Sequence, residues 1–342
     1  MDYSKNILLT GAGYTANYGG FLASDMYEKI FNNSRINSLS DIARGIISNS
    51  DDLDYEGIYS EIDASNDINP KDKTIARELV IDAYKALDKE LKSDFNKAGG
   101  TYSKVGRTLI QRIIGRGSQK GFFFTLNQDL LHESRSGMKA YGIPIAEAAK
   151  LNKKQVLERK DFVQLPNLSE IEKLKGRVSA AEGHVGDYRD LNDLNYIKLH
   201  GSYGWLSADG SDGMIFGKNK PRDLEKEPLL AFYLWLFREV LCRDGATLVV
   251  IGYSFRDKHI NDVILDAVKN YHLRLVIVGN MKKIKNQLCY SQDDSGVKKE
   301  LETKAIWEAR VAQFDKKLVD IFEDTNDGNL NTFAEDLLNK LS

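Results

Sequence analysis

The stretch Asn6-Ile-Leu-Leu-Thr-Gly-Ala-Gly-Tyr-Thr-Ala16 joins an apolar run directly to a glycine-rich turn. Ile7, Leu8 and Leu9 place apolar side chains on both faces of an extended chain, as expected of a parallel strand covered by helices. Residues 11–16 fit the G-x-G-x-x-G/A pattern in its strand-to-helix context, although a plain tight turn fits them too. Glycines in such a turn let the backbone approach a diphosphate closely. The stretch therefore predicts the first strand of an α/β sheet with a candidate nucleotide-binding turn.

Four later apolar runs, rich in β-branched or aromatic residues, predict further buried strands. They are Gly121–Thr125, Tyr196–Leu199, Thr247–Ile251 and Leu273–Val278. Helical patterns cover Ile75–Lys92, Tyr102–Gly115, Pro228–Cys242, His259–Tyr271 and Val297–Phe322. Strands that alternate with helices predict an α/β fold with a Rossmann-like, mainly parallel sheet and right-handed crossovers.

The spacing of these strands is uneven. A compact crossover needs about 30 residues, whereas about 110 residues separate the first strand from the second. We expect helical insertions at about 24–118 and 134–193, forming a smaller subdomain over the carboxyl edge of the sheet. Amphipathic helices are expected at about 297–341. The whole chain, 1–342, is predicted to be one elaborated domain.

Charge and hydropathy exclude two classes of function. The chain has 48 Lys and Arg against 50 Asp and Glu, a net charge of −2. Sequence-independent nucleic-acid binders need a broad basic surface, so no direct nucleic-acid binding is expected. The longest apolar stretch, Leu229–Val240, contains two charged residues and is too short to span a bilayer. Without a signal-peptide pattern at residues 1–14, we expect a cytoplasmic protein that does not bind membranes.

The two cysteines, Cys242 and Cys289, are isolated from each other in the sequence. Without C-x-x-C, H-x-x-x-H or E-x-x-H spacing, neither a disulfide framework nor a metal site is expected. Each cysteine is interpreted as a small buried apolar residue.

Polar residues follow the second and third strands at the edge where ligands of open α/β sheets bind. Thr125-Leu-Asn-Gln-Asp129 ends a run of three phenylalanines. For Asp129 a helix cap and a functional role are equally good interpretations, which makes Asn127 the stronger candidate. His200, in Leu199-His-Gly-Ser202, is followed by small residues that leave room for a ligand, and is interpreted as a titrating, substrate-facing group. The other histidines are interpreted as non-catalytic: His132, His184, His259 and His272.

Two further turns follow apolar strands at the same edge, Gly252-Tyr-Ser254 and Gly279-Asn280. Each alone fits an ordinary strand-to-helix turn, but five converging strand ends indicate a ligand site. Neither a phosphate-loop motif nor a G-x-S-x-G nucleophile elbow occurs. A hydride-transfer enzyme is disfavoured, because residues 17–45 read as helix and turn where a second strand should carry the ribose-binding acid.

In order, these pieces resemble the sirtuin superfamily: GAG at 11–13, T-x-N-x-D at 125–129, LHGS at 199–202, G-x-S at 252–254 and Asn280. The resemblance implies NAD as the substrate, with Asn127 and His200 catalytic and Asp129 in a supporting role. It also implies NAD contacts from Gly11, Ala12, Gly13, Thr125, Gly252, Ser254 and Asn280.

Two cysteines cannot form the four-cysteine zinc module of protein-deacylating sirtuins. Residues 252–261, GYSFRDKHIN, instead resemble the zinc-free sirtuin-like branch of prokaryotic anti-phage systems. That resemblance implies hydrolysis of NAD to ADP-ribose and nicotinamide, in a homo-oligomer or with a partner such as a HerA-type hexameric ATPase. Two alternatives stay open. One is a protein deacylase or ADP-ribosyltransferase with a peptide cleft near Gly213–Gly217, and the other is a non-catalytic, nucleotide-sensing assembly subunit.

Overall fold

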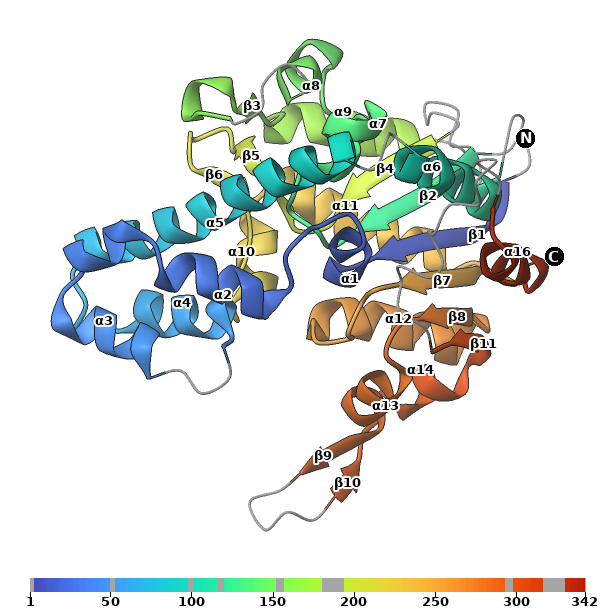
Figure 1. Ribbon diagram of the computed structural model, residues 1–342. Helices are drawn as coiled ribbons and strands as arrows, with labels where there is room; N and C mark the ends of the chain where they lie inside the picture. The colour runs from blue at the N-terminus through green and yellow to red at the C-terminus, as the bar shows by residue number, and fades with distance from the viewer. Residues whose placement is uncertain are drawn as a thin grey trace.

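The computed structural model describes residues 3–49, 53–97, 101–115, 120–151, 157–179, 194–292, 298–315 and 330–341. At its centre lies a six-stranded, all-parallel sheet flanked by helices (Figure 1). Its strands are β1 (Tyr3–Thr10), β2 (Lys120–Thr125), β4 (Leu194–Lys198), β7 (Thr247–Ile251), β8 (Arg274–Val278) and β11 (Arg310–Phe314). The predicted α/β fold with a Rossmann-like parallel sheet is confirmed.

The order of these strands across the sheet is β11-β8-β7-β1-β2-β4. Numbered by their succession in the chain, the six strands therefore read 3-2-1-4-5-6 from β4 to β11. The direction of winding reverses between β1 and β7. In open α/β sheets of this order, ligands bind outside the carboxyl ends of the strands at that reversal.

The register of the sheet brings the carboxyl ends of five strands to one level. Thr10 of β1 pairs with Thr125 of β2 and with Ile251 of β7. Thr125 in turn pairs with Lys198 of β4, and Ile251 pairs with Val278 of β8. The residues that follow these strands consequently emerge side by side along one edge.

The sheet is buried because both of its faces are apolar. Every residue of β7 is buried, and Phe122, Phe123 and Phe124 of β2 are 0% exposed. Helix α6 (Thr101–Ile114) packs against β1 and β2, and α11 (Pro228–Leu241) packs against α12 (Lys258–Tyr271) and β4. Over the described ranges, no helix is long and apolar enough to cross a membrane.

The first insertion is helical and forms a lobe beside the sheet (Figure 1). After the short α1 (Ala12–Ala16) of the glycine-rich turn, it contains α2 (Ala23–Phe31), η1 (Ser34–Ser38), α3 (Asp41–Ser48), α4 (Tyr55–Ala64) and α5 (Pro70–Lys97). The long α5 packs against η1, α2 and α4. Buried apolar side chains of α5, such as Leu79, Val80 and Leu87, hold the lobe together.

The second insertion is mixed. It contains α7 (Leu131–Ser136), α8 (Ile145–Leu151), η2 (Arg159–Asp161), β3 (Val163–Gln164) and α9 (Leu168–Ser179), while residues 180–193 lie outside the described ranges. Strand β3 joins β5 (Gly201–Leu206) and β6 (Asp212–Met214) in a small second sheet. Helix α10 (Lys220–Lys226) then leads into α11.

The helix predicted over Val297–Phe322 is wrong. The structure has β9 (Tyr290–Gln292) paired with β10 (Lys298–Glu300), then α14 (Lys304–Glu308) and β11, while residues 316–329 lie outside the described ranges. Burial in β11 alternates along the strand, and its pairing with β8 outweighs the local helical pattern. Helices α13 (Met281–Cys289) and α16 (Thr332–Asn339) complete the described C-terminal part.

Candidate active site

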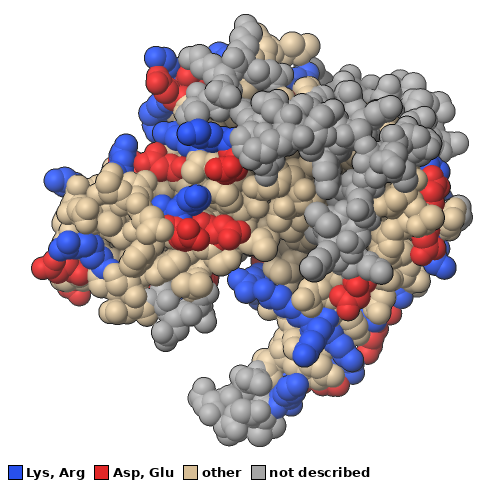
Figure 2. All heavy atoms as spheres, in the orientation of Figure 1, with Lys and Arg blue, Asp and Glu red and all other residues tan. Residues whose placement is uncertain are grey.

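A cavity of about 770 Å³ opens at the carboxyl edge of the sheet, where the winding reverses. One wall is formed by the turns after β1, β2, β4, β7 and β8. The opposite wall comes from the helical lobe, including Phe21, Met26, Tyr55 and Tyr84. Figure 2 shows the molecule hollowed between this lobe and the C-terminal part, with Lys and Arg side chains gathered on the C-terminal side.

The cavity brings together nearly all the site residues predicted from the sequence. Its lining includes Gly11, Ala12, Gly13, Asn127, Asp129, His200, Gly252, Ser254 and Asn280. Thr125 is not in this lining. It is 1% exposed, and its hydroxyl oxygen accepts hydrogen bonds from the Thr10 hydroxyl at 2.9 Å and from the Asn127 N–H at 3.1 Å. Thr125 therefore supports Asn127 from beneath the cavity floor.

The turns after β1 and β7 form one interlocked floor. Gly11 N–H donates to the Ile251 carbonyl and Gly13 N–H to the Gly252 carbonyl, each at 3.0 Å. Gly252 has φ +69°, and a Cβ there would lie 2.3 Å from the backbone nitrogen of Tyr14. Only glycine fits a position with both a left-handed backbone and so close an approach. Both glycine motifs are thus explained by the way the two turns pack.

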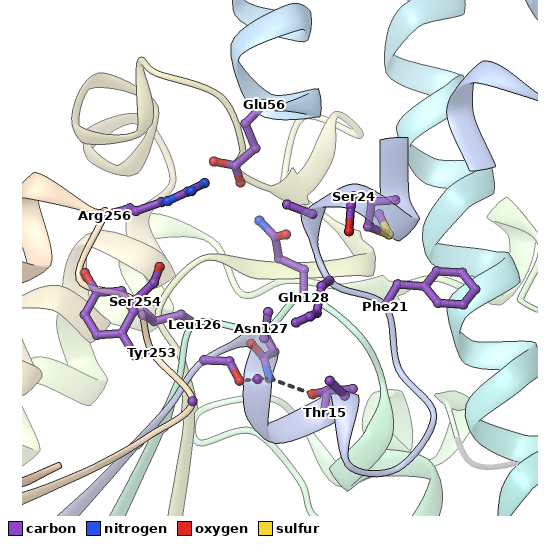
Figure 3. A pocket seen from close by; sticks show the side chains of 18 of the residues that line it. Thr15, Phe21, Ser24, Glu56, Leu126, Asn127, Gln128, Tyr253, Ser254 and Arg256 are labelled. Atoms are coloured by element: carbon purple, nitrogen blue, oxygen red, sulfur yellow. Dashed lines mark hydrogen bonds between the residues drawn. The ribbon is translucent and has the colours of Figure 1, made fainter. Parts of the chain in front are cut away.

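Asn127 is fixed by hydrogen bonds to the glycine-rich turn. Its Nδ2 donates to the Gly11 carbonyl at 3.0 Å and to Thr15 Oγ1 at 2.6 Å (Figure 3). Thr15 in turn donates its hydroxyl hydrogen to Asp129 Oδ2 at 3.0 Å. Because both amide hydrogens are used, the acceptor Oδ1 is the part of the amide left for a ligand.

Asp129 fits both interpretations that the sequence left open. Its Oδ1 accepts the Leu131 N–H at 3.0 Å at the start of α7, while Oδ2 binds Thr15 and the residue lines the cavity. Its backbone carbonyl accepts a hydrogen bond from the buried Nζ of Lys198. Asp129 is thereby held from three sides and in turn orients Asn127 through Thr15.

His200 is 2% exposed, and its Nε2 lies 3.0 Å from Nε2 of His259. Burial lowers the pKa of His200 well below 6.5, and the positive charge of Lys220 lowers it further. Burial likewise lowers the pKa of His259, to about 4. Both rings are therefore neutral near pH 7, and one Nε2 donates its hydrogen to the other.

An ionic cluster that the sequence analysis missed lies next to this pair. Lys220 Nζ bridges Glu56 at 2.8 Å and Asp257 at 2.7 Å, and all three residues line the cavity. Burial opposes the ionisation of Asp257, but the positive charge of Lys220 and its hydrogen bond hold the pKa of this carboxyl below its usual value. Burial raises the pKa of Glu56 despite the opposing effect of Lys220. Of these three residues only Asp257 had a local signal, its Asp-x-His spacing to His259 shortly after the Gly252–Ser254 turn.

Two further cations line the cavity, Arg256 and Lys283. Within the described part of the chain, neither forms an ion pair with a carboxylate. Figure 3 shows the Arg256 and Glu56 side chains reaching into the same space from different elements. The site therefore offers an anion two positive charges beside two glycine turns.

Neither a protein-family model nor a curated protein sequence matches this chain.

Proposed function

We propose that the chain is an NAD glycohydrolase that cleaves NAD to ADP-ribose and nicotinamide. The observation that carries the proposal is the register of the sheet, which brings Asn127 and His200 into one cavity at the winding reversal of a 3-2-1-4-5-6 sheet. That crevice is where sheets of this order bind dinucleotides. A volume of about 770 Å³ is within the usual range for ligand sites.

The cavity offers contacts along the length of a dinucleotide. The diphosphate would lie over the two glycine turns, with Arg256 and Lys283 to balance its charge. The NAD contacts proposed here are Gly11, Ala12, Gly13, Gly252, Ser254 and Asn280.

The bond to be broken joins C1′ of the ribose to the nicotinamide nitrogen. Nicotinamide leaves as a neutral molecule with the bonding electrons, and a water oxygen adds to C1′ and releases one proton. The site must therefore stabilise a ribosyl centre of oxocarbenium character and position the water. Asn127 Oδ1 is the acceptor that would orient the water or a ribose hydroxyl. His200 would take up the proton.

Proton uptake by His200 involves His259 as well. The His200 Nε2 is hydrogen-bonded to the His259 Nε2, 3.0 Å away. It can therefore accept a proton from the attacking water only when that hydrogen bond opens. The two rings therefore act as a unit, with His200 on the cavity side.

The biological setting is proposed from the sequence resemblance. NAD depletion would make the protein an effector of anti-phage defence in the cytoplasm, activated by homo-oligomerisation or by a partner such as a HerA-type ATPase.

A second groove favours the alternative of a protein deacylase or ADP-ribosyltransferase. It measures about 750 Å³, and its lining includes Gly213, Met214, Ile215 and Phe216. Gln128, which lines the first cavity, donates from Nε2 to the Ile215 carbonyl. An acceptor peptide in this groove would lie next to the NAD cavity.

One assay separates these functions. The purified chain is incubated with NAD, alone and with an acetyl-lysine peptide, and nicotinamide and ADP-ribose are measured. The hydrolase is supported if nicotinamide and ADP-ribose are released without peptide and this release is lost in Asn127→Ala and His200→Ala. The control His272→Ala, which changes an exposed histidine, should retain the release. Release only with peptide supports the alternative.

Turnover that survives both substitutions contradicts the assigned site. NAD binding without turnover, in the isolated chain and in every assembly detected by mass measurement, supports a nucleotide-sensing subunit.

A further inference from the structure

His200 and Asp257, which line the cavity, form a cluster with His259. His200 follows β4, whereas Asp257 and His259 stand at the start of α12. One ligand atom from each residue, two imidazole nitrogens and one carboxylate oxygen, lies within 4.8 Å of the others. Two histidines and a carboxylate are a common ligand set for zinc and related divalent ions.

The spacing of the two rings suits a shared ion. Two Zn–N bonds of about 2.0–2.1 Å at a tetrahedral angle place their nitrogens about 3.3 Å apart. The Nε2 atoms of His200 and His259 already lie 3.0 Å apart. Metal binding would require both rings to turn until their Nε2 lone pairs converge on the ion. The ring that carries its hydrogen at Nε2 would give up that proton and carry one at Nδ1 instead.

The carboxylate of Asp257 has an oxygen to offer. Its Oδ1 accepts a hydrogen bond from Lys220 at 2.7 Å, and within the described chain no hydrogen bond to Oδ2 is found. Metal-binding carboxylates are typically held in this way, with one oxygen on the metal and the other hydrogen-bonded. Glu56, on the other side of Lys220, offsets the positive charge of that lysine.

The surrounding structure also fixes the ligands. His200 hydrogen bonds with the backbone of Leu126, leaving its Nε2 for the cluster. The Asp257 N–H donates to the Tyr253 hydroxyl at 3.1 Å, and that hydroxyl lies 3.0 Å from Asn261 Oδ1. Of the three ligand residues, His200 and Asp257 are thus held in place by groups outside the cluster.

We propose that His200, Asp257 and His259 form a site for a divalent transition-metal ion of the zinc class, with a fourth position open to the cavity. An ion held at His200 Nε2 would occupy the nitrogen that the hydrolysis needs. Metal binding would then inhibit the NAD reaction, and this inhibition alone rests on the proposed function.

The experiment measures binding without any turnover. The full chain is treated with EDTA, dialysed, and titrated with Zn²⁺ by calorimetry and with Co²⁺ by visible absorption. We expect one ion per chain, with cobalt bands of a nitrogen and oxygen ligand set and no thiolate charge transfer. His259→Ala should weaken binding by more than about 100-fold, beyond the loss typical of outer hydrogen-bond partners.

Asp257→Asn is the second variant, because it keeps the shape of the side chain if His259→Ala folds poorly. The matched controls are His272→Ala, which removes an exposed histidine, and Cys242→Ser with Cys289→Ser, which removes both thiols. Both controls, the His272→Ala variant and the double cysteine variant, should bind Zn²⁺ and Co²⁺ as the wild type does.

The proposal would be overturned if neither Zn²⁺ nor Co²⁺ binds. It would also be overturned if folded His259→Ala and Asp257→Asn variants bind these ions as tightly as the wild type. If Zn²⁺ binds as expected but NAD cleavage is absent or insensitive to Zn²⁺, the metal site stands and the proposed hydrolase mechanism is what fails.

Discussion

The side-chain nitrogen of Asn127 lies 2.6 Å from the hydroxyl oxygen of Thr15, so the turn after β2 is bonded to the turn after β1. Asp129 sets the polarity of this contact, because its Oδ2 accepts the hydrogen of the Thr15 hydroxyl. Thr15 must then accept from Asn127, which leaves the amide oxygen as the free acceptor. A buried acid thereby orients the candidate catalytic amide through one hydroxyl.

Thr15→Val tests this chain of hydrogen bonds with little change in shape. Loss of the hydroxyl frees the Asn127 amide to rotate, and misplacement of a positioning group can lower turnover by about 100-fold. We expect the NAD turnover number to fall while the dissociation constant for NAD changes little. Thr15→Ser, which restores the hydroxyl, should recover most of the rate. Equal rates for the valine and serine variants would show that the hydroxyl does not orient Asn127.

Asp129→Asn should be at least as damaging as Thr15→Val, although it changes a single atom. With its oxygen on the Leu131 N–H, the new amide would present a donor to Thr15 and reverse the polarity of the chain. The Thr15 hydroxyl would then donate to the amide oxygen of Asn127. The Asn127 amide would have to flip, which would place its nitrogen on the side of the ligand. Nicotinamide release and the thermal unfolding midpoint are measured together. Retained turnover in a folded variant would exclude this polarity mechanism.

Gly252→Ala should destabilise the fold much more than Gly210→Ala. Both glycines have positive φ, +69° and +82°, but a Cβ at Gly252 meets the Tyr14 nitrogen at 2.3 Å, whereas one at Gly210 meets nothing within 4 Å. A left-handed alanine costs about 1–2 kcal/mol, and overpacking adds about 1–3 kcal/mol. Urea unfolding should therefore show a loss of about 2–5 kcal/mol for Gly252→Ala and only the smaller loss for Gly210→Ala. Equal losses would mean that the two turns are not closely packed.

The sheet could be predicted because buried parallel strands carry a local signature, continuous apolar runs closed by polar or glycine residues. Five strands were found this way, and their order in the chain sufficed to place Asn127, His200 and the glycine turns at one edge. Strand β11 was missed because the alternation in Arg310–Phe314 is short and its partner β8 is distant in sequence. Only tertiary pairing distinguishes it from part of a helix.

The rest of the site could not be predicted, because its partners come from separate elements. Lys220 bridges Glu56 of the helical lobe and Asp257 after β7, and no local pattern joins these residues. His259 looked like an ordinary helical residue until the fold placed it against His200. The sirtuin resemblance predicts an NAD contact for Thr125, but its hydroxyl is used in holding the cavity floor together.

Lys198 and Glu133 form a fully buried ion pair beneath the cavity, with Nζ and Oε1 2.9 Å apart. Lys198→Met would leave the Glu133 carboxylate without its counter-charge, and breaking a buried pair typically costs about 3–5 kcal/mol. We expect Lys198→Met together with Glu133→Gln to recover much of this loss, because the uncompensated charge is gone. A double-mutant cycle by urea unfolding measures the coupling. Additive losses from the two substitutions would contradict a direct interaction.

His132 should make the protein sensitive to acid. It is packed between Phe123 and Tyr196, and among the described residues its Nε2 has no hydrogen-bond partner. Burial lowers its pKa from 6.5 to about 3. Below pH 6.5 the unfolded chain binds a proton that the folded chain excludes, so stability is lost as the pH falls from about 6.5 towards 3. At pH 4.5 this difference amounts to about 3 kcal/mol.

The measurement is urea unfolding at pH 7.5 and at pH 4.5 for the wild type and for His132→Leu, in EDTA so that bound metal plays no part. The buried pair His200 and His259 is present in both proteins, so the comparison isolates His132. We expect the wild type to lose about 3 kcal/mol more than the variant between the two pH values. Equal losses would mean that His132 takes up its proton without unfolding, and that the aromatic cluster around it is open to water.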